Sequence, residues 1–420
     1  MSIFRKWPKR RSLLDAPLHY HSIITWEQGH VRASVIKMNK GAAELIGVAS
    51  SPIHGITCTS HPDIERWTKG CNQALLQAED MTPTTHGHKI VPDYVIMGVP
   101  SGLARDVALT VSKHRRHANK EISKDELAQL AKRGYRQVQD RMGTRTKGAG
   151  EDIIYGSLAN IVLDGHSVLD PLGLHGEQIE LHLNFTLIPV EWIRALELIA
   201  ENLRLYLVAI VPHHVACASA TPDPRALLIV LYEDYTVAAL IRYGKPEWAG
   251  TINIGEREMT MATTQVLNLR GHRADMLMRA YREGRLREDI EEKLAIAFWA
   301  ALRRWMTTLA NEIKTAPSQE EPPSRIYFCD TTRRLPEARL SLCTPFWEHC
   351  LSFQGCPEVI ELSISHVHSV LDCTTLAGDA PYLLLRTLAH HTAQLYAPRN
   401  YLDRLLLNTV RWKKVPTLPF

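Results

Sequence analysis

Apolar and polar residues alternate along several stretches of the chain, most regularly over residues 178–187. Five apolar residues fall on one side of this stretch: Ile179, Leu181, Leu183, Phe185 and Leu187. Four polar residues fall on the other: Glu180, His182, Asn184 and Thr186. A period of two predicts a strand with one face on a core and the other in solvent. Residues 94–100 are nearly all apolar and predict a second, buried strand.

Helical spacing appears between these two strands and elsewhere. Ser123 and Glu126 have the spacing of a capping box, and apolar residues follow at steps of three and four through Val138. Residues 91–190 therefore predict a small α/β unit inside a longer chain. The same reasoning predicts a helix from about His61 with Ser60 as its cap, and further helices around residues 193–203, 290–313 and 382–395.

Two regions with the same order of strands flank this unit. Residues 22–48 predict three strands joined by two tight turns, and a helix follows them. Residues 226–254 repeat this order, with turns at residues 232–235 and 243–246. The repeat indicates an internal duplication of architecture, although the two sequences share almost no identity.

Composition is that of a soluble globular protein. A chain of 420 residues predicts two or more lobes, and a formal net charge of +4 is too small to indicate nucleic-acid binding. No apolar segment of a secretory signal follows the basic start, and the eight cysteines form no CxxC pair. We therefore expect a cytoplasmic protein with reduced thiols and no metal site.

Several short segments share a pattern with one superfamily. The most specific is Asp170-Pro-Leu-Gly-Leu174, which follows Leu163-Asp-Gly165; weaker ones are Glu44 to Val48, Glu121 to Glu126 and Ile254-Gly255. On these segments the chain resembles the FtsA and PilM families of the actin/Hsp-seventy/hexokinase superfamily, over roughly residues 20–395. The resemblance implies an α/β, actin-like fold (ASKHA, ribonuclease H-like and duplicated) with an inserted FtsA-type 1C, or SHS2, subdomain.

The resemblance also implies a domain organisation in six parts. They are a basic tail expected to be disordered (1–19), the first actin-like half 1A (20–90), the inserted 1C/SHS2 subdomain (91–190), the return to 1A (191–225), the second half 2A (226–395, with 2B at about 256–320), and an amphipathic basic tail (396–420).

In this superfamily the first turn of each meander holds the phosphates of ATP. Such turns use glycine because the backbone must approach the phosphate oxygens without an intervening Cβ. Here Trp26, Tyr232 and Tyr235 are bulky where a phosphate needs room, and the acidic residues nearby would repel it. We expect ATP and Mg²⁺ binding to be lost, with no catalytic residue. The degenerate positions are Thr25, Glu27, Gly29, Val230, Glu233, Asp234 and Asp330.

Two regions are candidates for partner contacts. The first is the inserted unit, where the basic segment 114–120 is expected to be exposed; its candidate residues are Arg115, Arg116, Lys120, Asp170 and Gly173. The second is an amphipathic helix predicted over residues 400–414, which suits a membrane surface or, alternatively, packs on its own domain. Its candidate membrane contacts are Leu402, Leu405, Leu406, Val410, Arg411, Trp412, Lys413 and Lys414.

These features together predict an FtsA-like, non-catalytic adaptor in bacterial cell division that tethers a cytoskeletal or envelope machine to the inner face of the membrane. Its expected partners are an FtsZ-like or pilus-assembly membrane protein, a second copy of the chain and an anionic membrane surface, and the protein would be peripheral on the cytoplasmic side. Two alternatives stay open: a PilM-like platform for type IV pilus assembly, and an actin-fold ATPase or kinase with an atypical nucleotide site.

Overall fold

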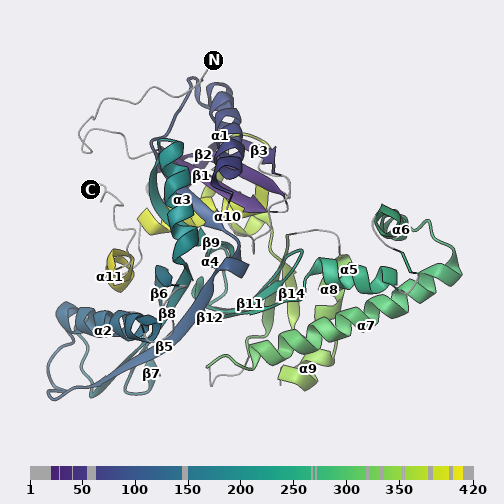
Figure 1. Cartoon of the computed structure of the whole chain (residues 1–420). Helices are drawn as coiled ribbons and strands as arrows, with labels where there is room; N and C mark the ends of the chain where they lie inside the picture. Colours follow the sequence, from purple (N-terminus) through teal and green to yellow (C-terminus); the bar gives the residue numbers. More distant parts are fainter. Residues whose placement is uncertain are drawn as a thin grey trace. The chain divides into compact units, whose positions relative to one another are not determined.

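Both predicted three-stranded meanders are present (Figure 1). They consist of β1 (Tyr20–Glu27), β2 (His30–Asn39) and β3 (Ala42–Pro52), and of β10 (Arg225–Leu231), β11 (Thr236–Arg242) and β12 (Lys245–Ile252). In each, a central strand pairs with both of its neighbours along the chain. The predicted duplication of strand order is therefore confirmed.

The computed structural model describes residues 20–409, apart from residues 28, 40, 54–62, 144–149, 266–267, 270–271, 318–321, 332–334, 352, 354, 377–381 and 397–400. The chain divides into two units. Unit 1 contains the chain up to Pro224, the segment Ile241–Trp248 and the chain from Ser363 onwards. Unit 2 contains Arg225–Leu240 and Ala249–Leu362. Within the described part, no helix has both the length and the apolar character needed to cross a membrane.

The main sheet of unit 1 has six strands in the order β15-β3-β2-β1-β4-β9. The added strands are β4 (Tyr94–Val99), β9 (Tyr206–Pro212) and β15 (Val370–Asp372), and β4 pairs in parallel with both β1 and β9. Two helices, α1 (Ile64–His86) and α3 (Val190–Asn202), share one apolar core with this sheet. The predicted start of α1 is wrong: Asp63 caps the helix by accepting from the backbone N–H of Arg66 at 3.1 Å, and Ser60 lies outside the described residues.

A second sheet of unit 1 corresponds to the predicted insertion. It has the order β5-β8-β6-β7 and is covered by α2 (Lys124–Gly143). Its strands are β5 (Arg105–His114), β6 (Glu151–Leu163), β7 (His166–Ser167) and β8 (Gln178–Pro189). The predicted boundary at residue 91 is wrong because β4 pairs with β1, so β4 belongs to the main sheet. We use "inserted subdomain" for residues 105–189.

The pattern predicted for β8 is confirmed for its apolar residues and wrong for two of its polar residues. The five alternating apolar residues are at most 1% exposed. Asn184 and Thr186, predicted to face solvent, are buried as well, and both donate hydrogen bonds of 2.7 Å to Oδ1 of Asp106 on β5. The Asp106 carboxylate thus accepts from a donor of each side chain, which makes their burial possible.

The described part of unit 2 contains most of a five-stranded sheet, whose residues Ile241–Trp248 belong to unit 1, and five helices. The sheet has the order β12-β11-β10-β13-β14, with β13 (Arg325–Asp330) and β14 (Glu358–Glu361) pairing in parallel. The helices are α5 (Glu256–Gln265), α6 (His272–Arg282), α7 (Glu288–Ile313), α8 (Pro336–Leu342) and α9 (Phe346–Leu351). The apolar stripe predicted along α7 is buried from Leu294 to Ile313, whereas its first residue, Ile290, is partly buried. Nε1 of Trp305 donates to Oγ1 of Thr236 at 2.9 Å.

The end of the second half was predicted at residue 395, and this boundary is wrong. From Ser363 the chain belongs to unit 1, where β15 pairs with β3 in parallel and α10 (Leu383–Tyr396) packs on β1, β2 and β3. The remaining helices of unit 1 are α4 (His213–Ser219) and α11 (Tyr401–Thr409). Two short 3-10 turns lie at Ser101–Leu103 and Ile364–His366.

Candidate functional site

The β1–β2 turn of unit 1 is closed by its own side chains. Thr25 is fully buried, and its Oγ1 lies 2.6 Å from Nε2 of His213, the first residue of α4. Burial lowers the pKa of His213 to about 3, with smaller contributions from His214 and Arg32, so the ring is neutral at pH 7. A neutral imidazole and a hydroxyl satisfy each other here, and neither carries charge toward a ligand.

Bulky and charged neighbours complete this turn. The ring of Trp26 lies edge-on to Trp67, with centroids 4.3 Å apart, and is stacked on Trp192 at 6.2 Å. Glu27 pairs with Arg32 at 3.2 Å, and both side chains are largely buried. Gly29 has a φ of +70° and accepts at its carbonyl from the N–H of Ile53 at 2.6 Å, so glycine at this position serves the turn itself.

The β10–β11 turn of unit 2 is closed in a different way. The rings of Tyr232 and Tyr235 stack with centroids 4.4 Å apart. Glu233 and Asp234 both pair with Arg257 of α5, at 2.7 and 2.6 Å. The backbone of the turn also lies against Gly255, where a Cβ would come within 2.5 Å of the Glu233 carbonyl. The two carboxylates predicted to repel a phosphate, or to hold its metal, are therefore directed at a guanidinium.

The other degenerate positions are structural or lie at the edge of the described part. Val230 is fully buried in β10. Asp330 ends β13, is partly exposed, and lies opposite Leu231 in the parallel register. The resemblance also implies a third nucleotide contact, a glycine pair in the family, at residues 329–333, where this chain has no glycine; residues 332 and 333 of this stretch lie outside the described residues.

Arg115 is not part of an exposed surface, and that prediction is wrong. Its side chain is buried, its Nε donates to Glu126 at 3.2 Å, and its two terminal nitrogens donate to the carbonyls of Gly176 and Lys120 at 2.8 and 2.7 Å. Burial alone would raise the pKa of Glu126, but hydrogen bonds from Lys113 and Arg115 lower it below its ordinary value. Arg116 and Lys120 are exposed.

Asp170 and Gly173 belong to a tight turn in the inserted subdomain. Oδ1 of Asp170 accepts from the N–H of Leu172 at 3.0 Å, and Leu174 N–H donates to the Pro171 carbonyl at 3.1 Å. Gly173 has a φ of +76°, which the third position of such a turn requires. The pattern Asp-Pro-Leu-Gly thus has a local structural cause, and a role in partner contacts stays a prediction.

The apolar stripe of α11 is buried on its own unit. Leu402 and Leu406 are 3% and 0% exposed and belong to the core of the inserted subdomain, with Leu405 packed beside them. Their predicted membrane contact is wrong, and the alternative of packing on the chain's own domain is what the structure shows. Val410, Arg411, Trp412, Lys413 and Lys414 lie outside the described residues.

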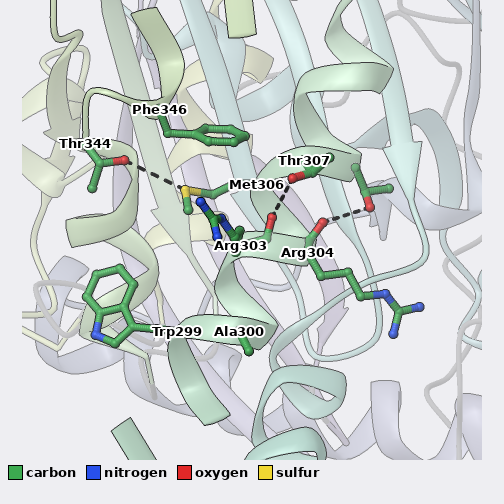
Figure 2. Close-up of a pocket in the computed structure, with 9 residues that line it drawn as sticks. Trp299, Ala300, Arg303, Arg304, Met306, Thr307, Thr344 and Phe346 are labelled. Atoms are coloured by element: carbon green, nitrogen blue, oxygen red, sulfur yellow. Dashed lines mark hydrogen bonds between the residues drawn. The ribbon is translucent and has the colours of Figure 1, made fainter. Parts of the chain in front are cut away.

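Sequence reasoning missed a groove on α7 of unit 2 (Figure 2). The cavity measures about 840 Å³, and its lining includes Trp299, Arg303, Met306 and Phe346. Figure 2 shows the guanidinium of Arg303 between Trp299 and Phe346, whereas Arg304 points away. Arg304 pairs with Glu258 at 2.9 Å; Arg303 has no ion pair in the described part of the chain.

A signal for this groove was present in the sequence. Five residues recur at helical spacing on a second side of α7: Ile296, Trp299, Ala300, Arg303 and Thr307. Ile296 and Trp299 are 66% and 46% exposed, although the opposite side of α7 is core. A helix with two apolar sides, one of them next to an arginine, is the pattern that marks such a surface.

No protein-family model matches the sequence, and no curated protein matches it either. Among solved structures, the chain is similar to one titled PilM-PilN type IV pilus biogenesis complex, at 13% identity and a TM-score of 0.57, covering 89% of this chain and 99% of that one. It is less similar to the ethanolamine utilization protein EutJ from Carboxydothermus hydrogenoformans (10% identity, TM-score 0.45, 89% of each chain covered). The ROK hexokinase from Thermus thermophilus gives 9% identity and a TM-score of 0.40, covering 88% of this chain and 97% of that one.

The similarity to the PilM-PilN structure shows the fold of this chain. The chain has the actin-like ATPase fold, as the sequence predicted. Fold alone does not assign an activity.

Proposed function

We propose that this protein is a non-catalytic adaptor with an actin-like fold, which binds partner proteins of a bacterial envelope machine. One observation carries the proposal: in both phosphate turns the protein's own side chains take the place of a ligand. Thr25 is bound to His213 in unit 1, and Arg257 holds Glu233 and Asp234 in unit 2. A nucleotide would have to break buried or charge-assisted contacts in each turn before gaining its own.

The partner that best fits this proposal is a short cytoplasmic segment of a pilus-assembly membrane protein. The similarity to a PilM-PilN complex extends over 99% of that chain, which supports a pilus platform. The FtsA-like role in cell division is the competing version, with the tail of an FtsZ-like protein as partner. In either version the adaptor would be peripheral on the cytoplasmic face of the membrane.

A nucleotide titration tests the loss of ATP binding. Purified protein is heated with and without about 5 mM Mg-ATP, and we expect the two melting temperatures to agree. Binding with a Kd near 50 μM would stabilise the fold by about 2.7 kcal/mol and raise Tm by several degrees. Such a shift, if lost in Glu233→Ala or Asp234→Ala variants, would instead support the atypical ATPase or kinase.

Peptide capture tests the partner class. The immobilised cytoplasmic segment of a pilus membrane protein and the tail of an FtsZ-like protein are each offered to the full chain. Charge reversal at Arg303 tests the α7 groove, and charge reversal at Arg116 tests the inserted subdomain. Each variant is the control for the other, because the two residues lie in different units. Retention of neither peptide would contradict the adaptor.

A further inference from the structure

An apolar face of the inserted subdomain is covered by a helix from the far end of the chain. α11 contacts α2 and β6, and its Leu402 and Leu406 complete the core that these elements build with β5 and β8. The ring of Tyr401 lies beneath Nζ of Lys124, 5.7 Å from its centroid. Without α11, the leucine contacts on α2 and β6 would face water.

One ion pair fixes α11 at its other side. Nζ of Lys245, in the first residue of β12, pairs with Oδ1 of Asp403, and both side chains are mostly buried. Within the described residues, Lys245 makes its ion pair with α11. Displacement of α11 would leave the partly buried ammonium of Lys245 beside an apolar face. A segment that replaces α11 is therefore favoured if it carries a carboxylate at the position of Asp403.

A small cavity lies beside Asp403 of α11. It measures about 50 Å³ and is lined by residues that include Tyr155, Lys245, His391 and Asp403. His391 is 4% exposed, and in the part of the chain that the structure describes neither ring nitrogen has a hydrogen-bond partner. Burial lowers its pKa to about 3, so the ring offers one donor and one acceptor. α11 thus pairs with Lys245 and leaves His391 without a hydrogen bond among the described residues.

We define the α11 face as the surface of α2 and β6 beneath α11, together with Lys245 and His391. We propose that the α11 face is a docking surface for an acidic amphipathic segment of a partner protein, and that α11 occupies it until the partner displaces it. The matching segment carries two apolar residues four positions apart, a carboxylate between them, and a polar side chain that reaches His391. This inference rests on the proposed adaptor function.

The length of α11 supports displacement. The helix has nine residues. Isolated helices of this length are marginal in water, so α11 depends on the face that it covers. The apparent affinity of a competing segment equals its intrinsic affinity multiplied by the fraction of chains in which the α11 face is free. A partner that also bonds to His391 would gain contacts that α11 lacks.

A peptide of residues 400–410, labelled with a fluorophore, is the probe. It is titrated into the full chain, into the Leu402→Ser/Leu406→Ser double variant, and into Arg404→Ser, whose exposed side chain on the same helix makes it the matched control. We expect the double variant to bind the peptide about ten-fold or more tightly than the other two, because its own helix no longer competes. A peptide with the same two serines should not bind.

A charge swap gives a second measurement that leaves both leucines in place. Asp403→Lys should release α11 and raise peptide binding. Adding Lys245→Asp should restore the ion pair with reversed charges and abolish peptide binding. Equal binding by wild type and both variants would overturn the proposal, as would a folded double-serine variant that binds no better than wild type. Nucleotide binding would remove the adaptor function without changing these titrations, so the two failures are distinguishable.

Discussion

Arg115 shows how one charged side chain organises a region of the inserted subdomain. Its guanidinium joins three chain segments, through Glu126 of α2, the carbonyl of Gly176 and the carbonyl of Lys120. A buried arginine of this kind is structural, because its removal leaves the carbonyls of Gly176 and Lys120 without its donors and leaves Lys113 as the remaining donor to Glu126.

Replacing Arg115 should therefore destabilise the protein far more than replacing its neighbour. We expect Arg115→Ala to lower the free energy of unfolding by about 3 kcal/mol and Arg116→Ala by less than about 0.5 kcal/mol. Urea denaturation followed by circular dichroism measures both. Equal losses in the two variants would show that Arg115 contributes no more to the free energy of unfolding than the exposed Arg116.

His213 should make stability depend on pH. Its pKa is about 3 in the folded protein and about 6.5 when unfolded, so below pH 6.5 the unfolded state takes up a proton that the folded state excludes. Stability from this group is complete above pH 6.5 and falls by about 1.4 kcal/mol per pH unit as the pH drops toward 3. His391, lowered in the same direction, adds a second such loss.

The measurement is urea denaturation at pH 7.5 and pH 5.0. We expect the wild type to lose more stability between these values than His213→Gln, with a difference of about 2 kcal/mol. His114→Gln, at an exposed position, is the control. An unchanged pH dependence in His213→Gln would mean that the ring is protonated in the folded state.

At the scale of elements, two sides of α7 have different surroundings. Trp305 faces the core of unit 2 and donates to Thr236, whereas Trp299 lies in the groove and is 46% exposed. The two tryptophans are six residues apart on one helix, so they allow a comparison in which helix propensity and residue type are constant.

Trp305→Ala should destabilise unit 2 by about 3–5 kcal/mol, through the cavity it leaves and the donor it removes. Trp299→Ala should cost less than about 1 kcal/mol while weakening capture of whichever peptide the groove binds. Thermal unfolding and the capture assay measure the two effects separately. Similar losses of stability would argue that the groove belongs to the core.

At the scale of the whole molecule, we expect a membrane contact of this region to come from residues after α11, because Leu402 and Leu406 are buried while α11 is in place. Residues 410–414 supply three basic side chains and a tryptophan. Each basic residue near an anionic surface contributes about 1 kcal/mol, so a chain ending at Thr409 should bind anionic vesicles about 100-fold more weakly than the full chain.

Co-sedimentation with vesicles that contain phosphatidylserine measures this difference, and vesicles of neutral lipid are the control. The effect should shrink at high salt, since it depends on charge. Equal sedimentation of both chains would leave the proposed tether without a membrane contact in the last residues.

Periodicity predicted many of the helices and strands, and the fold class came from the resemblance of short motifs to a known superfamily. The alternation in β8, the repeated meanders and the stripe of α7 are local patterns that bury one face, and the strands and helix they predicted are present. The glycine losses in the phosphate turns could also be read from the sequence, because the need for glycine at a phosphate is local and steric.

Only the tertiary structure decided which polar groups are buried and which elements share a sheet. The sequence predicts Arg115 to be exposed, but in the fold it donates hydrogen bonds to Glu126, Gly176 and Lys120 and is buried. The sequence predicts β4 as part of the insertion, but β4 pairs with β1 of the main sheet. Leu402 and Leu406 suit a membrane by pattern, but they pack in the core of the inserted subdomain, where α11 contacts α2 and β6. Each outcome depends on contacts between residues distant in sequence, and a local pattern contains no information about its partner.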